Sequence, residues 1–468
     1  MEKSYKIPGE EERIFFRSLL GDKGLSWSDD DLMKYGSDHT EDIVSLPSIV
    51  LFPETSEQIS SILSYCQNQN IAVTPRGAGT GLSGGSIPLY SGVSLSVERM
   101  NKILDIDERN FQVTVQPGVI TQVLQEAVEE KGLFYPPDPA SKCSCFSAGN
   151  IAENSGGPKA VKYGVTKDYV LNLEVVLVGG EVIWTGANVL KNSTGYNLTQ
   201  LLIGSEGTLG VITKAVLRLI PKPRYDLLIL VPFRSGEAAC KAVADIFYKG
   251  ITPSGLEFME RDALLIGSKF LKTDALAIED DIEAHLLIEV DGNNEEDLVR
   301  DMELIHQVLE NYDCGDILFA DSAAQKEKLW KMRRCLGEAV KSESIYKEED
   351  TVVPRAELPK LLSGVKAIGK KYGFRSVCYG HAGDGNLHVN ILKDDLSDET
   401  WNHTIKKGIR EIFELCVKLG GTISGEHGIG LVQKEYLNIA FDENQMEIQR
   451  RIKRVFDPKQ ILNPGKVL

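Results

Sequence analysis

The sequence predicts an α+β protein of two or three domains, and three observations carry this prediction. The chain has 468 residues, which is enough for more than one sizeable hydrophobic core. Its first half contains three glycine-rich loops set between strand-like and helix-like segments. Its second half, after Arg224, alternates strand and helix patterns, which is typical of helices packed on an antiparallel sheet.

Composition narrows the class of protein. Hydrophobic residues make up 42% and charged residues 26%, as in ordinary globular proteins. The net charge of -16 speaks against nucleic acid and anionic membranes as partners, although a local basic funnel for a small anion stays open. The opening MEKSYKIPGEEER lacks the features of a signal or transit peptide, and no apolar stretch approaches the roughly 18 residues of a transmembrane helix. Eight cysteines without CxxC spacing predict reduced thiols and a cytoplasmic location.

The first half opens with helices at 9–20 and 55–69, the second capped by Thr55 or Ser56. Strands at 50–53 and 71–75 flank the second helix. RGAGTGLSGGS follows directly, and its five glycines let backbone N–H groups turn inward as a nest for a pyrophosphate. The loop is neither a Walker loop nor a Rossmann fingerprint, and a flexible surface loop is the alternative.

Two further loops share this character. Strands at 93–99 and 111–118 and a helix near 119–131 lead to a polar, glycine-rich stretch at 134–164, too long for a mere connector. A hairpin at 171–186 then precedes GSEGTLGVIT at 204–213, which enters a strand. Surface loops seldom produce three such segments in one half of a chain, so we expect a ligand there.

The second half begins near residues 222–225, where PKPR marks a domain boundary. The predicted strands are LLILVPF, LEFME, HLLIEVDG, ILFA, TVVP, SVCYG and LHVNIL. The predicted helices are 236–248, 295–312, AAQKEKLWKMRRCLGEAVK, 356–373 and 399–419.

The stretch GHAGDGNLHVN carries His381 and His388 on the two sides of a glycine-rich turn. That turn can bring both imidazoles to one point, and Glu426 in the later SGEHGIG offers a carboxylate. Two histidines and one carboxylate suit a divalent transition metal with positions left open for substrate, and Zn, Mn, Fe and Co all accept such ligands. Surface or capping histidines beside a turn are the alternative.

Other polar residues near these motifs are candidates for acid–base chemistry and substrate contact. His427 directly follows the third candidate ligand, and its alternative is a histidine satisfied within a tight glycine turn. Asn390 points to the same side of a strand as His388 and could hydrogen-bond a substrate, or be a plain strand residue. Arg333 and Arg334 offer a planar cation for a carboxylate, with a solvated helix face as the alternative.

The motifs together resemble a known family. PRGAGTGLSGG, PPDPASKC with GNIAENSGG, and IGSEGTLGVIT are similar to the FAD-binding domain of the vanillyl-alcohol oxidase superfamily, or PCMH type. GHAGDGNLHVNI, SGEHGIG and FDPKQILNPGK are similar to its D-2-hydroxy-acid dehydrogenase branch, which includes a glycolate oxidase component and D-lactate dehydrogenase. The resemblance covers nearly the whole chain. It implies a PCMH-type FAD-binding domain at 1–222, an α+β cap domain with an antiparallel sheet at 223–419, and a segment at 420–468 that returns to the FAD domain.

The resemblance also implies roles for individual residues. His381, His388 and Glu426 would be the metal ligands, His427 the catalytic base, and Arg333 and Asn390 the substrate-binding residues. Thr80 stands where some relatives attach the flavin through histidine, so the FAD would be noncovalent. Ala148 departs from a more usual glycine. The implied FAD-binding residues are Pro75, Arg76, Gly77, Ala78, Gly79, Thr80, Gly81, Leu82, Ser83, Pro137, Asp138, Ser141, Gly149, Asn150, Glu153, Gly157, Glu206, Gly207, Gly210, Val211, Ile212 and Asn463.

The implied reaction is oxidation of a 2-hydroxy acid to the 2-oxo acid, with hydride passing to flavin N5. Lys347 lies one position out of register with a substrate lysine of the hydroxyglutarate enzymes, and Gly337 replaces a helpful threonine, which favours a monocarboxylate such as D-lactate or glycolate. Electrons would pass to an electron-transferring flavoprotein, an iron–sulfur subunit or a quinone. An oxygen-using oxidase and a noncatalytic electron-relay subunit are the alternatives, and a homo-oligomer stays open.

Overall fold

The structure is a computed structural model that describes residues 4–40, 43–273 and 278–468. The chain forms two compact units. The first unit comprises 1–155, 165–222 and 426–468, and the second comprises 156–164 and 223–425. These limits differ from the predicted domain limits in two ways. Residues 156–164 group with the second unit, and the chain returns to the first unit after Gly425 rather than near Gly420.

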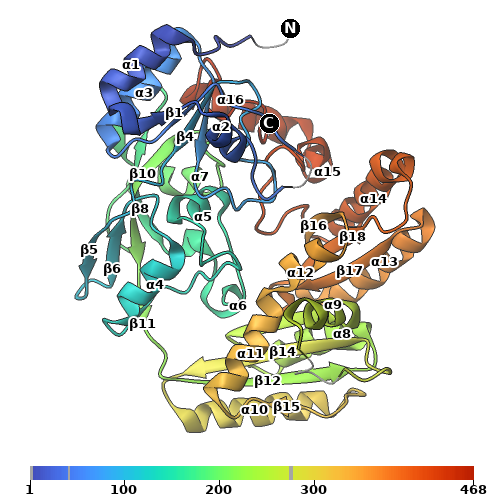
Figure 1. Ribbon diagram of the computed structural model, residues 1–468. Helices are drawn as coiled ribbons and strands as arrows, with labels where there is room; N and C mark the ends of the chain where they lie inside the picture. Colours follow the sequence, from blue (N-terminus) through green and yellow to red (C-terminus); the bar gives the residue numbers. More distant parts are fainter. Residues whose placement is uncertain (1–3, 41–42, 274–277) are drawn as a thin grey trace. The chain divides into compact units, whose positions relative to one another are not determined.

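The first unit contains two main sheets (Figure 1). The first sheet has the order β1-β2-β4-β3, in which β4 runs parallel to both β2 and β3. The second has the antiparallel order β5-β6-β10-β8-β9. The strands of these sheets are β1 (Leu25–Ser26), β2 (Ile49–Leu51), β3 (Val73–Arg76), β4 (Val93–Ser96), β5 (Ile103–Asp107), β6 (Gln112–Val115), β8 (Val170–Val176), β9 (Val182–Trp184) and β10 (Val211–Arg218).

The helices of this unit explain how its glycine-rich loops are held. Helix α3 (Ser56–Gln69) is capped by the Thr55 side chain, which accepts from the Gln58 N–H, and it ends at Asn70 in the left-handed conformation. Its buried stripe packs into a core with β2, β3 and β4, so the chain leaving β3 enters the first loop from a rigid strand. The remaining elements are α1 (Glu10–Leu20), α2 (Asp29–Tyr35), α4 (Thr121–Glu129), β7 (Leu133–Phe134), α5 (Ser147–Glu153), α7 (Leu198–Leu202), β11 (Ile220–Pro221), α15 (Leu437–Ala440) and α16 (Glu443–Phe456).

The second unit is built on a seven-stranded sheet in which every described pairing is antiparallel. Its order is β15-β12-β14-β13-β17-β18-β16, which confirms the predicted α+β cap with an antiparallel sheet. The strands are β12 (Tyr225–Phe233), β13 (Gly255–Glu260), β14 (Ala284–Gly292), β15 (Leu318–Phe319), β16 (Tyr346–Val352), β17 (Arg375–Gly380) and β18 (Asn386–Leu392).

Helices cover both faces of this sheet. One face packs against α8, α10, α13 and α14, and the other against α9, α11 and α12. The helices are α6 (Ala160–Tyr163), α8 (Gly236–Tyr248), α9 (Arg261–Leu271), α10 (Glu295–Leu309), α11 (Ala323–Arg334), α12 (Leu336–Glu343), α13 (Leu358–Tyr372) and α14 (Ile405–Lys418).

Two predicted elements of this unit were wrong in detail. The predicted single helix over AAQKEKLWKMRRCLGEAVK divides at Cys335 into α11 and α12, where α11 ends and a new helix packs against α9. The predicted strand TVVP covers only the end of β16. The observed strand begins earlier, in the charged residues before TVVP, and pairs with β18 along its whole length. Helix α9 was not predicted.

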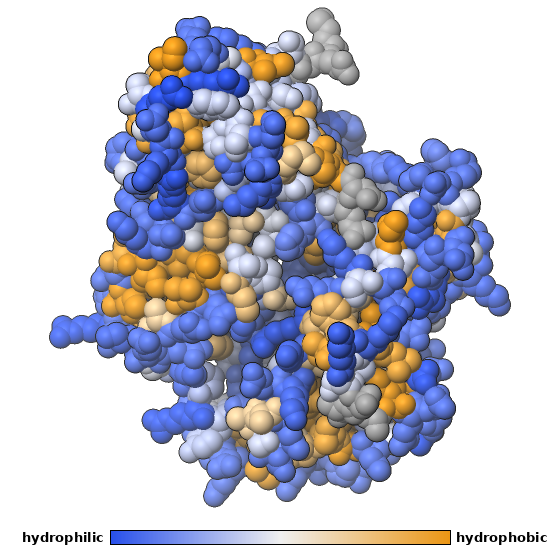
Figure 2. Space-filling model, in the orientation of Figure 1, coloured by the Kyte–Doolittle hydropathy of each residue, from blue (hydrophilic) through white to orange (hydrophobic). Residues whose placement is uncertain are grey.

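No helix among the described residues is long and apolar enough to span a membrane. The face of the molecule in Figure 2 is largely hydrophilic, in keeping with the charge of the chain. Groups of apolar residues interrupt this surface in Figure 2, and Leu104 on β5 and Phe111 after it are among the exposed apolar side chains of the chain. Exposed apolar residues are ordinary in folded proteins, so we assign them no role.

Candidate functional site

The turn between β17 and β18 brings His381 and His388 together. A short 3-10 turn at Ala382–Asp384 ends in Gly385, whose φ of 78° and close approach to the Val353 carbonyl oxygen require glycine. The ring centroids of the two histidines lie 5.4 Å apart at 83°, and both side chains are buried. Their candidate ligand nitrogens lie within 4.8 Å of each other. Two buried imidazoles at one point are the donors that a divalent transition metal prefers.

A buried carboxylate that the sequence did not predict lies beside this pair. Glu257, on β13, is fully buried, and both of its oxygens lie 2.9 Å from His381 Nδ1. Burial alone would raise the pKa of this carboxyl, but the nearby Arg333 and His381 hold its pKa below the ordinary value. An ionised carboxylate therefore faces the imidazole.

Arg333 joins the same cluster from the last turn of α11. Its Nε lies 2.6 Å from Glu257 Oε2, and its guanidinium stacks on Tyr379 at 5.2 Å from the ring centroid. With 5% of its surface exposed, Arg333 is not on a solvated helix face. The neighbouring Arg334 points elsewhere, with its guanidinium 5.2 Å from the Trp330 ring centroid.

Strand β16 supplies two more carboxylates on the other side of β18. Glu348 and Asp350 lie 3.5 and 3.7 Å from His388 Nδ1. Asn390, one pleat beyond His388, is fully buried, and its Nδ2 donates to the Val377 carbonyl oxygen at 3.3 Å. The sequence prediction missed both carboxylates because the charged run KEED has the composition of a surface segment, although its place directly before TVVP could have indicated a longer strand.

Asp350 also ties the two histidine-containing motifs together. Its side chain accepts from Asn386 Nδ2 at 2.7 Å, from the Gly425 N–H at 2.8 Å and from the Ser424 hydroxyl at 3.1 Å. Gly425 is therefore pinned to β16, and Glu426 follows it by one peptide bond at the start of the next segment of the first unit.

The glycine-rich loops of the first unit leave room for a ligand beside their backbones. An ideal Cβ built on Gly77 would lie 3.7 Å from Gly149, so the first and second loops run side by side. A Cβ on Gly81 or on Gly149 would meet nothing within 4 Å. Backbone exposed along two adjacent glycine-rich loops can approach a flavin nucleotide closely, and these loops fit that cofactor.

The third loop and the C-terminal segment close around the first two. Glu206 accepts from the N–H groups of Ile429 and Gly430, both at 2.7 Å. Asn463 donates to the carbonyl oxygens of Gly85 and Glu206 at 2.9 and 2.8 Å. Arg76 donates to the Ser37 carbonyl oxygen at 2.7 Å, so its guanidinium holds the start of the first loop.

Glu206 shares its surroundings with a second buried carboxyl, Glu153. Burial raises the pKa of Glu206 to about 7, and burial together with Glu206 raises the pKa of Glu153 well above its usual range. Gly428, with φ of 81°, lies against both, since a Cβ there would come within 2.1 Å of Glu153 Oε2. His427 therefore directly precedes a backbone position that these two carboxyls restrict.

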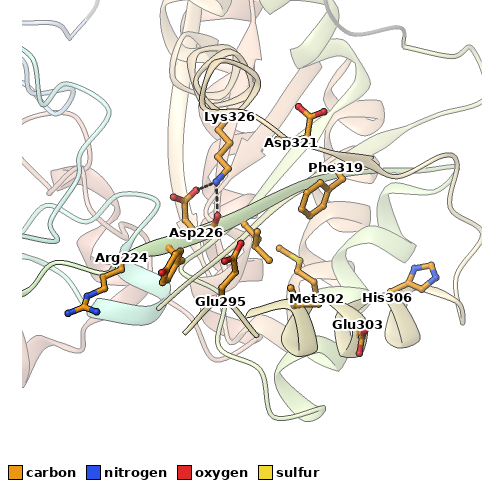
Figure 3. Close-up of a pocket in the computed structure, with 13 residues that line it drawn as sticks. Arg224, Asp226, Glu295, Met302, Glu303, His306, Phe319, Asp321 and Lys326 are labelled. Atoms are coloured by element: carbon orange, nitrogen blue, oxygen red, sulfur yellow. Dashed lines mark hydrogen bonds and ion pairs between the residues drawn. The ribbon is translucent and has the colours of Figure 1, made fainter. Parts of the chain in front are cut away.

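A separate pocket of about 720 Å³ lies at the opposite edge of the seven-stranded sheet, beside α10, β12 and β15 (Figure 3). Lys326 reaches across it to Asp226 at 2.7 Å, and Phe319 and Met302 line it. The strands β14, β13 and β17 separate this edge from His388, and none of the predicted site residues lines the pocket.

Comparison with protein families and known proteins places the chain. A model of the FAD-binding domain matches residues 47–186, and one of the C-terminal domain of FAD-linked oxidases matches residues 222–467. The glycolate oxidase subunit GlcD of Bacillus subtilis is 40% identical over 434 residues, which cover 92% of this chain and 91% of that protein. The D-lactate dehydrogenase of Anaerostipes hadrus is 38% identical over 456 residues, which cover 96% and 94%.

A solved structure shares the fold. p-Cresol methylhydroxylase with bound substrate superposes with a TM-score of 0.79 at 19% identity, over 99% of this chain and 98% of that one. Both family matches and the two similar proteins show that the chain belongs to the FAD-linked oxidases of the PCMH type, as an oxidoreductase homologous to FAD-dependent 2-hydroxy-acid dehydrogenases.

Proposed function

We propose that the protein oxidises a small D-2-hydroxy acid, D-lactate or glycolate, to the corresponding 2-oxo acid. The observation that carries the proposal is the cluster of His381, His388 and Arg333, buried together on one face of the seven-stranded sheet. The similar proteins bear the names of a glycolate oxidase subunit and a D-lactate dehydrogenase, which supports this substrate class.

In this proposal His381, His388 and Glu426 hold a divalent metal ion. The ion, when bound, supplies a Lewis acid for the substrate hydroxyl and carboxylate. Two buried imidazoles with nitrogens within 4.8 Å fit such an ion, and Glu426 follows the pinned Gly425. Zn, Mn, Fe and Co all suit this donor set.

The substrate is held and deprotonated by the chain's own residues. Arg333 presents a planar cation to the substrate carboxylate, and Asn390 lies one pleat from His388 to hydrogen-bond the substrate. His427 accepts the hydroxyl proton, since the unperturbed pKa of histidine lies near neutral pH. FAD would bind at the glycine-rich loops without a covalent bond, because Thr80 stands where some relatives have the attaching histidine. When bound, it supplies the acceptor for the C2 hydride.

The charged side chains around the proposed site favour a substrate with a single carboxylate. Around His388 the structure places Glu348 and Asp350, whose charge would repel a second substrate carboxylate. Among the described contacts of this cluster, Arg333 supplies the guanidinium that would bind one substrate carboxylate. The electrons then pass to a further subunit or carrier, such as an electron-transferring flavoprotein, an iron–sulfur subunit or a quinone. Similarity to a protein named as a subunit supports a further subunit as partner.

A reduction screen tests the proposal. Purified, metal-replete protein is mixed anaerobically with D-lactate, L-lactate, glycolate and D-2-hydroxyglutarate, and the flavin absorbance is followed. We expect D-lactate or glycolate to bleach the flavin and L-lactate and D-2-hydroxyglutarate to do so much more slowly. No bleaching by any of the four refutes the proposal. Rapid reoxidation by air with stoichiometric hydrogen peroxide would instead identify an oxidase.

A further inference from the structure

Glu257 contacts the two groups that the proposed chemistry needs in fixed positions. Its carboxylate lies 2.9 Å from His381 Nδ1 and 2.6 Å from Arg333 Nε, and the side chain has 0% exposure. Buried carboxylates are seldom retained without a partner, and this one has two. The contacts join three separate elements: β13, α11 and the end of β17.

The geometry determines which nitrogen of His381 carries the proton. A carboxylate ionised beside a guanidinium can only accept hydrogen bonds, so Nδ1 of His381 must be the N–H donor. A neutral imidazole with a proton on Nδ1 carries its lone pair on Nε2, which is the form that binds a metal through Nε2. Arg333 Nη2, 3.5 Å from the same Nδ1, cannot donate to a nitrogen that already carries hydrogen.

The same carboxylate fixes the guanidinium. Glu257 Oε2 forms an ion pair with Nε of Arg333 at 2.6 Å, and the guanidinium stacks on the face of Tyr379. A guanidinium held in this way keeps its terminal nitrogens in one orientation for a planar carboxylate.

We propose that Glu257 is a positioning residue that holds His381 as the Nδ1–H tautomer for metal binding and orients Arg333 for the substrate carboxylate. This inference rests on the proposed function, because it assumes that His381 is a metal ligand. Hydrogen-bond partners of metal-bound histidines typically change metal affinity by about 10- to 100-fold when they are removed.

The chain offers a matched control in Glu289. It is a buried carboxylate on the neighbouring strand β14, and it accepts from Trp330 Nε1 and Ser254 and pairs with Lys159. These partners do not include His381 or Arg333. Replacing either glutamate with glutamine removes one buried charge from the same face of the sheet.

The test measures metal affinity in metal-stripped holoenzyme by competition between the protein and a chromogenic chelator for Zn²⁺ or Mn²⁺. Glutamine is uncharged, so in Glu257→Gln the charge-assisted hydrogen bond that holds the proton on His381 Nδ1 and the ion pair with Arg333 are both lost. We expect Glu257→Gln to weaken metal binding by about 10- to 100-fold. Glu289→Gln should leave the metal Kd unchanged, with FAD content equal in all proteins.

A spectroscopic readout separates positioning from a general structural role. In metal-free, ¹⁵N-histidine-labelled protein, the wild-type His381 signals, assigned by their loss in His381→Ala, should show a protonated Nδ1. They should shift towards a tautomer mixture in Glu257→Gln. If Glu257→Gln does not fold, Glu257→Asp keeps the charge with a shorter reach, and we expect weakened metal binding with the tautomer retained.

Three results would overturn or redirect the inference. A wild-type metal Kd in Glu257→Gln, or in Glu257→Asp where only that variant folds, contradicts it. An unchanged tautomer in Glu257→Gln contradicts it as well. Wild-type protein that binds neither ion refutes the metal centre of the proposed function itself, and is thereby distinguished from failure at Glu257 alone.

Discussion

At the scale of single residues, the proposed site depends on side chains that are aimed by buried partners. His381 is aimed by Glu257, and His388 lies between β16 carboxylates and Tyr379. His427 lies one residue before Gly428, whose left-handed backbone leaves no room for a side chain beside Glu153. Such crowding restricts the backbone beside His427 more than a flexible loop would.

Replacement of His427 tests the proposed base. In His427→Asn a polar side chain is kept, but the group proposed to take the hydroxyl proton is lost. General base catalysis contributes about 10²- to 10⁴-fold, so we expect flavin reduction by D-lactate to slow by that factor. Stopped-flow absorbance measures the rate, and FAD content should equal that of wild type. A rate close to that of wild type argues against the role.

The sequence predicted the histidines but not the carboxylates around them. A histidine flanked by glycines is conspicuous, and the pairing of His381 with His388 follows from the turn between them. Glu257 gave no signal because a charged residue within a short strand such as LEFME is indistinguishable from one on a solvated face. Its burial depends on α11, which delivers Arg333 from a distant part of the chain.

At the scale of elements, β16 organises the site by holding Ser424 and Gly425 near the turn of GHAGDGNLHVN. Asp350 accepts from Asn386 on β18, and from Ser424 and Gly425 in the segment that leads to Glu426. The strand was only partly predicted, because its consecutive acidic residues disfavour a strand locally. Pairing with β18 along its whole length outweighs that local preference.

Replacement of Asp350 tests this link. Asp350→Ala removes the side-chain acceptor of Asn386 Nδ2, the Ser424 hydroxyl and the Gly425 N–H, although the first and last keep backbone acceptors. Each hydrogen bond that is lost costs about 0.5–1.5 kcal/mol. We expect a lower free energy of unfolding in urea and weaker metal binding. Asp398→Ala is the control, since Asp398 is highly exposed in its pair with Lys393 and its loss should leave the free energy of unfolding close to that of wild type. Equal effects of the two substitutions would contradict the role of Asp350.

At the scale of the whole molecule, the C-terminal segment completes the first unit. Leu462 forms a parallel bridge to Val73, and Lys466, which is buried, donates to the Ile87 carbonyl oxygen. The resemblance placed this return near residue 420, whereas Ser424 and Gly425 still belong to the second unit. No periodic pattern in the sequence marks the point where the chain returns to the first unit, because hydrogen bonds to Asp350 rather than hydrophobic spacing hold the residues before it.

Stability should depend on pH through Glu153 and Glu206. Their pKa values are raised in the folded protein, so the folded state binds more protons than the unfolded state above the ordinary carboxyl pKa of 4.5. Stability is therefore fully present below that pH and is lost as pH rises, through about 7 for Glu206. The slope is at most about 1.4 kcal/mol per pH unit for each group.

Glu153→Gln isolates this effect, because glutamine mimics the protonated carboxyl and cannot ionise. The stability of wild type relative to the variant should fall as pH rises, measured by urea unfolding of both proteins across neutral pH. Contributions from titrating groups remote from this pair largely cancel in the comparison. A difference that is constant with pH would show that Glu153 does not hold its proton in the folded protein.

The most direct test of the proposed chemistry is the anaerobic reaction of D-lactate or glycolate with wild type and His388→Ala. We predict that the variant keeps its FAD and is reduced by dithionite, but that its flavin is not bleached by either acid, whereas the wild-type flavin is. His403→Ala, an exposed histidine of the same unit, should behave as wild type. Bleaching of His388→Ala at the wild-type rate would contradict the claim that this histidine cluster is the site of substrate oxidation.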